Sequence, residues 1–153
     1  MSYVRELAQG LADGLGNVTF GSVTTQPTVS RQNWATVDLA AMADPVIYVT
    51  PGEVQMARVG RGITQSDYGV TVFVGRHVTT EGDADDMIDL AEEVLLHIRA
   101  HDWGEVTPFP AGITSPMTVS INLNPDDALQ ERNVWRAVIE ASYRVFEQDA
   151  LPG

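Results

Sequence analysis

The sequence predicts an α+β domain: a single, mostly antiparallel β-sheet with two helices packed on one face and a long β-hairpin. Three observations favour this class. Several segments alternate apolar and polar residues as strands do, two segments place apolar residues at helical spacing, and no repeat or linker divides the chain. At 153 residues the chain is long enough to bury a core. We therefore expect residues 1–153 to form one domain.

The composition excludes several classes of function. Twenty-one acidic residues against nine basic ones give a net charge of −12, and such a field repels phosphate, so a protein that coats DNA or an anionic membrane is disfavoured. The absence of cysteine excludes disulfides, thiolate metal sites and cysteine nucleophiles. The apolar runs are too short for a membrane span and no secretory signal is visible. We expect a protein made and kept in the cytoplasm.

The N-terminal third is predicted to contain one helix and a long loop. Residues 4–15 place Val4, Leu7, Leu11 and Leu15 on one helical face, and two glycines end the pattern. Residues 16–35 are polar, which indicates a loop with one weak strand near residues 18–23. Residues 36–42 fit one or two helical turns.

The middle of the chain predicts the hairpin. Residues 45–51 are β-branched and aromatic between two prolines, which is typical of a short buried strand. Gly52 is expected to form a turn before a second strand at residues 54–59. After the loop at residues 60–62, residues 68–78 alternate with period two and complete the long antiparallel hairpin.

The last half adds one helix and two strands. Residues 83–102 carry an apolar stripe from Met87 to Ile98, with Asp83 expected as the N-cap. A proline-rich loop at 104–116 precedes an alternating strand at 117–123. The sequence then predicts a short helical segment from 124 to 132, a strand from 133 to 147 and a frayed tail at about 148–153.

Two motifs suggest metal sites, and both have a simpler interpretation. Residues 81–93 hold seven carboxylates, but they lack the central glycine of a calcium loop and run directly into a helix. His97 and His101 are one turn apart, but the glutamate and third ligand of a zinc site are missing. We interpret the carboxylates as a solvated acidic helix face. We interpret the two histidines as positive charge that complements the dipole at the C-terminal end of the helix. The sequence predicts no catalytic residue, no metal and no cofactor.

Arginine supplies all the positive charge of the chain, and it favours interfaces over solvated surfaces. Arg58, Arg61 and Arg76 are expected to cluster at one end of the hairpin. In so acidic a protein, such a cluster favours pairing with acids on a neighbouring chain over binding nucleic acid.

The order of these segments resembles one known family. Residues 37–42, Val-Asp-Leu-Ala-Ala-Met, precede the strand of residues 46–51, Val-Ile-Tyr-Val-Thr-Pro. Arg58 and Arg61 stand shortly before residues 68–74, Tyr-Gly-Val-Thr-Val-Phe-Val. An acidic turn leads into the second helix, and Asn-Pro-Asp-Asp follows the penultimate strand. Over about residues 1–147 the chain resembles the tail terminator, or neck and tail-completion, proteins of long-tailed bacteriophages.

The resemblance implies a structural virion protein without catalytic residues. Family members form a six-fold homo-oligomeric ring at the head-proximal end of the tail, which ends tail-tube polymerisation and presents a surface to the head–tail connector or stopper protein. DNA would pass through such a ring without specific binding. The expected interface residues with a neighbouring subunit or the tube are Arg58, Arg61, Arg76, Arg136 and Arg144, and the acidic candidates for the lumen are Glu81, Asp83, Asp85 and Asp86.

Three alternatives remain open at this point. The chain could be another connector component, such as a head-completion or stopper protein. It could be a tail-tube-like subunit, which would stack on itself without limit. It could also be an acidic metal-dependent hydrolase that uses the carboxylates at residues 81–86.

Overall fold

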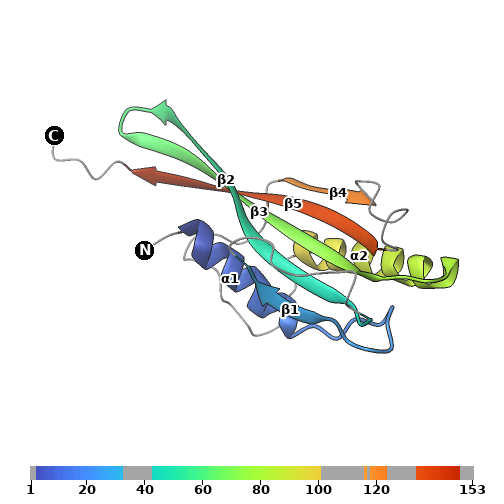
Figure 1. Ribbon diagram of the computed structural model, residues 1–153. Coiled ribbons are helices and arrows are strands. Elements are labelled where there is room, and N and C mark those ends of the chain that lie inside the picture. Colours follow the sequence, from blue (N-terminus) through green and yellow to red (C-terminus); the bar gives the residue numbers. More distant parts are fainter. Residues whose placement is uncertain (1–2, 33–42, 101–115, 117, 124–133, 149–153) are drawn as a thin grey trace.

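The protein is an α+β fold, seen in a computed structural model that describes residues 3–32, 43–100, 116, 118–123 and 134–148. These residues form one mixed five-stranded sheet of order β1-β2-β3-β5-β4 and two helices (Figure 1). The elements are α1 (Tyr3–Gly16), β1 (Thr28–Arg31), β2 (Val46–Gly60), β3 (Ile63–His77), α2 (Glu81–Ala100), β4 (Thr118–Leu123) and β5 (Val134–Gln148). Here β1 runs parallel to β2, and the other three strand pairs are antiparallel. The predicted α+β class is therefore confirmed.

Both helices pack on the same face of the sheet and share one core. The buried stripe of α1, with Leu7, Leu11 and Leu15, and that of α2, with Leu90 and Val94, belong to a single cluster with the apolar side chains of the sheet. β3 and β5 contribute every second residue, namely Tyr68, Val70, Val72, Val74, Trp135, Ala137, Ile139, Ala141 and Tyr143. The helical and period-two patterns of the sequence thus converge on one core, as expected.

β2 is one strand, whereas the sequence predicted two strands separated by a turn at Gly52. The register to β3 shifts between Pro51 and Val54, so the extra residues form a β-bulge in a continuous strand. β1 pairs with β2 only as far as Val49, so Pro51 lies where β2 is an edge strand. A proline is tolerated at such a position because its missing N–H would point away from the ladder.

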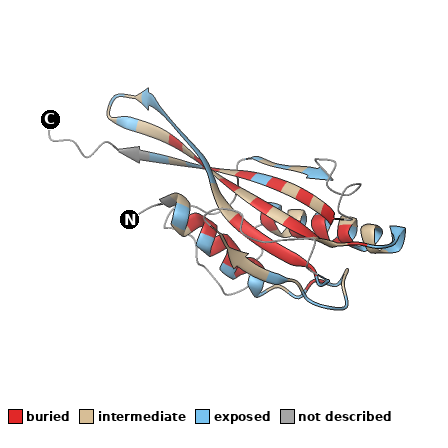
Figure 2. Ribbon diagram, viewed as in Figure 1, coloured by how far each residue is buried: buried red, intermediate tan, exposed pale blue. Residues whose placement is uncertain are grey.

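Beyond the bulge, the sheet continues as a projecting arm. We use this name for residues 54–66 of the β2–β3 hairpin together with residues 145–148 of β5. In Figures 1 and 2 the arm extends past both helices, and β2 is exposed at every residue from Gly52 to Val59. The hairpin closes at Gly62, whose φ of 70° favours glycine. The long hairpin of the prediction is therefore confirmed.

One predicted strand is wrong, two are confirmed within one residue, and the strand predicted at residues 68–78 is longer than expected, since β3 begins at Ile63. Residues 18–23 do not form a strand, and the first strand is instead β1, which begins at Thr28. β4 and β5 agree with the predicted strands at 117–123 and 133–147. The helical turns expected at 36–42 and 124–132, the loop at 104–116 apart from Pro116, and the tail from 149 lie outside the described residues. Neither α1 nor α2 is long and apolar enough to cross a membrane.

Candidate assembly surface

The five arginines expected at an interface do not lie together. Arg58 and Arg61 are exposed at the tip of the arm, where Arg58 pairs in register with Thr64. Arg76 lies at the opposite end of β3, where Gly75 pairs with Val46. Twelve residues of strand separate Thr64 from Arg76, which is about 40 Å at ~3.3 Å per residue. The expected cluster of Arg76 with the other two is wrong, because β2 and β3 run as one extended ladder.

Arg76 joins two elements of its own chain. Its guanidinium lies 3.5 Å from Asp83 Oδ2, and its Nε donates a hydrogen bond to the carbonyl oxygen of His77 at 2.9 Å. The ion pair connects the end of β3 to the first turn of α2. These contacts give Arg76 a structural role within the chain.

Arg144 is also engaged within the chain, near the base of the arm. Its Nε and Nη2 donate to the two carboxylate oxygens of Asp67 at 2.8 and 3.1 Å across β5 and β3. This two-bonded geometry is the strongest form of such a pair. The hydrogen bond from Arg144 lowers the pKa of Asp67 below its ordinary value.

Arg136 takes part in a small packed cluster on the face opposite the helices. Its guanidinium lies 5.5 Å from the centre of the Phe73 ring, within the range of a cation–π contact. Phe73 stacks on Tyr48 with ring centres 4.7 Å apart, and Val46 and Val134 complete the cluster. Burial raises the pKa of Tyr48, and the charge and hydrogen bond of Arg136 offset part of that rise.

Asp83 stabilises the start of α2, but it is not the N-cap that the sequence predicted it to be. The Thr80 hydroxyl accepts a hydrogen bond from the Asp83 N–H at 3.1 Å, which makes Thr80 the N-cap. The Asp83 carboxylate in turn accepts bonds from the N–H and hydroxyl of Thr79, both at 3.2 Å. The backbone N–H of Thr79 is the main cause of the lowered pKa of Asp83. The other acidic candidates for the lumen, Glu81, Asp85 and Asp86, are exposed along the first turns of α2.

Glu93, the last of the seven carboxylates, holds the segment after α1 against α2. It accepts hydrogen bonds from the N–H groups of Gly21 and Ser22 at 3.0 and 3.1 Å and from the Ser22 hydroxyl at 2.7 Å. Gly21 and Ser22 belong to the segment that was expected to form a weak strand, and their N–H groups bond to Glu93 and not to a neighbouring strand. Burial raises the pKa of Glu93, but the bonds from Ser22 and Gly21 outweigh it and leave the pKa lowered.

The histidines of the suggested zinc pair are not brought together as a site. His97 lies edge-on to the Phe20 ring, with centroids 5.7 Å apart, and His101 lies outside the described residues. In the part of the chain that the structure describes, no three His, Asp or Glu side chains are grouped to hold a metal ion.

The arm carries exposed apolar side chains that sequence reasoning did not single out. Met56 is 65% exposed and Phe146 is 62% exposed, with Val54, Val59 and Ile63 also at the surface. Register places Val54 and Met56 on the side of the sheet that faces the helices, and Ile63 and Phe146 on the other. The arm therefore exposes apolar side chains on both faces. The sequence did contain a signal for this surface: the strand between Gly52 and Gly60 is flanked by glycines, and no acidic residue occurs from residue 54 to 66.

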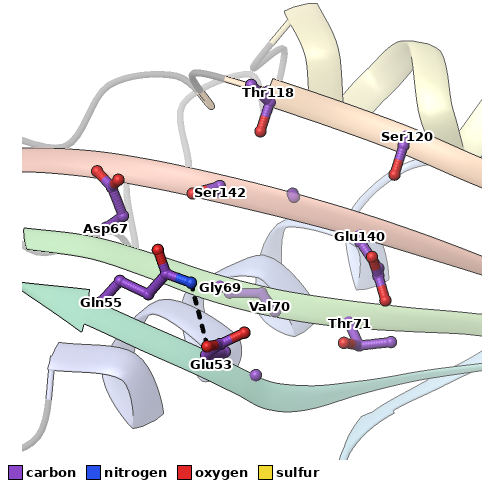
Figure 3. A pocket seen from close by; sticks show the side chains of 12 residues that line it. Glu53, Gln55, Asp67, Gly69, Val70, Thr71, Thr118, Ser120, Glu140 and Ser142 are labelled. Carbon is purple, nitrogen blue, oxygen red and sulfur yellow. Dashed lines mark hydrogen bonds between the residues drawn. The ribbon is translucent and has the colours of Figure 1, made fainter.

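An acidic groove lies where the arm joins the body, on the face opposite the helices (Figure 3). Its volume is about 280 Å³, and β2, β3, β4 and β5 all contribute to it. Three carboxylates line it, from Glu53, Asp67 and Glu140, among hydroxyl groups of Thr71, Thr118, Ser120 and Ser142. Gln55 donates a hydrogen bond to Glu53 at 3.1 Å. This groove was not anticipated, because its acids come from three separate strands.

Comparison with known proteins does not assign the chain to a protein family. No protein-family model and no curated protein sequence matches it.

Proposed function

We propose that this protein is a structural subunit of a phage virion that forms a ring at the head-proximal end of the tail and ends tail-tube polymerisation. The observation that carries the proposal is the arm. A ribbon that projects from a two-layer core and exposes Met56, Phe146 and Val59 has a higher free energy in water than when these side chains are covered. Exposed apolar patches of this kind mark interaction sites. The chain is therefore built to be covered by other subunits.

Charge supports a role beside DNA without binding to it. The chain has a net charge of −12, and Glu81, Asp85 and Asp86 are exposed on α2. A conduit that made many phosphate contacts would hold the duplex, whereas an acidic wall repels it and lets it pass. Acidic residues facing the lumen of a ring fit this requirement.

The place of the ring in the virion comes from the resemblance of the sequence to tail terminator proteins. On that basis the partners are other copies of this chain, most simply six, the tail-tube protein and the head–tail connector or stopper protein. The protein acts in the neck of the virion after assembly in the host cytoplasm. It requires no cofactor and no bond-making chemistry.

The test is to add the purified protein to the polymerising tail-tube protein of the same phage and to measure tube length by electron microscopy. We expect shorter tubes with a ring at one end. Unchanged tubes together with binding to head particles would replace this proposal with a head-completion or stopper role. Unlimited stacking of the protein on itself would indicate a tube subunit.

A further inference from the structure

We propose that the arm of one copy docks in the acidic groove of a second copy, where Arg58 and Arg61 meet the carboxylates of Glu53 and Glu140. This inference rests on the proposed ring and identifies the contact between its neighbours. It assigns a donor surface and an acceptor surface to every subunit.

The hairpin part of the arm, residues 54–66, has the opposite charge to the rest of the molecule, while β5 adds one acid to the arm, Glu147. Residues 54–66 contain Arg58 and Arg61 and no acidic residue, in a chain whose net charge is −12. Two copies therefore repel one another in most orientations, and the repulsion is relieved when the arm of one approaches an acidic surface of the other. Charge therefore favours the arm as the part that a second copy accepts.

The groove has the chemistry that a guanidinium group requires. Asp67 is already paired with Arg144, while no described cation forms an ion pair with Glu53 or Glu140. These two carboxylates reach the groove from β2 and β5, and hydroxyl groups of the same walls provide further acceptors. Arginine donates up to five hydrogen bonds in a planar fork that matches carboxylates. A volume of about 280 Å³ suits side chains better than a large ligand.

The arm of the same chain cannot fill this groove. Arg58 pairs with Thr64, whereas the groove lies beside Gly69 and Thr71 on the same strand. Five to seven residues of extended strand separate these positions, which is about 20 Å at ~3.3 Å per residue. Because the ladder from β2 to β3 holds the arm extended, an arm that occupies the groove must come from another copy.

Docking of this kind is a head-to-tail contact, which forms a ring when the rotation between neighbours closes. The arm and the groove are different surfaces of one chain, so each copy can donate to one neighbour and accept from another. Met56 and Val59 flank Arg58 on the arm, so docking also removes apolar surface from water. The exposed acids of α2 lie on a convex helix rather than in a groove, and the experiment below compares these two acceptors.

The absence of native cysteine allows a clean cross-linking test. One variant carries Val59→Cys on the arm and a second carries Ser120→Cys in the groove, so a disulfide between the two can form only between chains. The variants are mixed with the tail-tube protein and oxidised, and the mixed dimer is identified by mass. Docking raises the local concentration of the two thiols, so we expect a yield about tenfold above that of Val59→Cys mixed with Asp89→Cys on α2. Equal yields, a higher yield with Asp89→Cys, or no mixed dimer would overturn the inference.

Charge reversal tests the arginine–carboxylate contact itself. Arg58→Glu with Arg61→Glu should abolish the cross-link, and so should Glu53→Arg with Glu140→Arg. Combining a reversed arm on one variant with a reversed groove on the other restores opposite charges and should restore the cross-link. Failure to restore it, with both variants folded by circular dichroism, would contradict the contact.

The same variants separate this inference from the proposed function. If the arm-reversed variant still shortens tail tubes, the docking inference fails while the terminator role stands. If arm and groove cross-link as expected but the wild-type protein leaves tube length unchanged, docking stands and the terminator role fails.

Discussion

Gly52 and Gly69 face each other across β2 and β3 so closely that neither position has room for a side chain. A Cβ atom on Gly52 would lie 2.9 Å from the backbone carbon and oxygen of Gly69, and a Cβ on Gly69 would lie 2.8 Å from the carbonyl oxygen of Glu53. This close approach coincides with the register shift between Pro51 and Val54. The two glycines thus allow the bulge from which the arm projects.

Replacing Gly69 by alanine should destabilise the protein. The new methyl group would meet backbone atoms, which cannot rotate away, so we expect a loss of about 1–3 kcal/mol in the free energy of unfolding, as for other overpacked sites. Urea denaturation measures it. Gly16→Ala is the control, because nothing lies within 4 Å of a Cβ at that position. Equal stability of the two variants would show that the strands can separate without cost.

Replacing Thr80 by alanine should weaken the start of α2. The Thr80 hydroxyl satisfies the Asp83 N–H, and loss of an N-cap costs about 1 kcal/mol. Thermal or urea unfolding detects this loss. Thr80→Ser keeps the hydroxyl and should stay close to wild type, so an equal loss in both variants would contradict the capping role.

The bonds of Glu93 should make stability depend on pH. The pKa of Glu93 is lowered in the folded state, so its contribution is present above its ordinary value of 4.5 and is lost as the pH falls through the folded value. In Glu93→Gln, an NH₂ group replaces one accepting oxygen among the Gly21 and Ser22 donors. We expect the variant to be about 1 kcal/mol less stable at neutral pH, with the difference from wild type shrinking in acid.

Free energies of unfolding measured from neutral pH down to acid pH below 4.5 test the effect. The neighbouring residue Glu92 is exposed, so Glu92→Gln is the matched control and should change stability little at any pH. A constant difference between Glu93→Gln and wild type down to acid pH would exclude the ionised carboxylate as its source.

The exposed apolar side chains of the arm should matter for assembly and little for folding. Met56 and Phe146 are 65% and 62% exposed, so Met56→Ser and Phe146→Ser should each change the free energy of unfolding by less than about 0.5 kcal/mol. The same variants should lose the ability to shorten tail tubes. Leu96→Ser on α2, at a residue 49% exposed, is the control and should retain it. If both arm variants shortened tail tubes as well as wild type does, the arm would not be part of the assembly interface.

Regular periodicity made most of the fold predictable. The stripes of α1 and α2 and the alternation of β3 and β5 are local properties of the sequence, and each predicted the right element. β1 was missed because Thr28–Arg31 has only four residues and little alternation. Its position is fixed by parallel pairing with Val46–Val49, a partner distant in the chain that no local pattern reveals.

The candidate site was less predictable because its contacts are long-range. Asp67 and Arg144 are 77 residues apart in sequence, and Glu93 is 71 residues from Ser22. Period-two alternation tells which side of a strand a residue faces, but not where the strand lies against its neighbours. For that reason Arg76 was grouped with Arg58 although the ladder places them at opposite ends.

The continuous ladder of β3 has a mechanical consequence. Every residue of β3 from Ile63 to His77 is paired with β5, with no register shift, so the same strand runs through the arm and the body. A pull on the hairpin tip along this axis loads many interstrand hydrogen bonds at once, in shear, instead of opening them one after another. A tensile load applied to the arm would therefore be carried into the body of the protein without peeling its sheet apart.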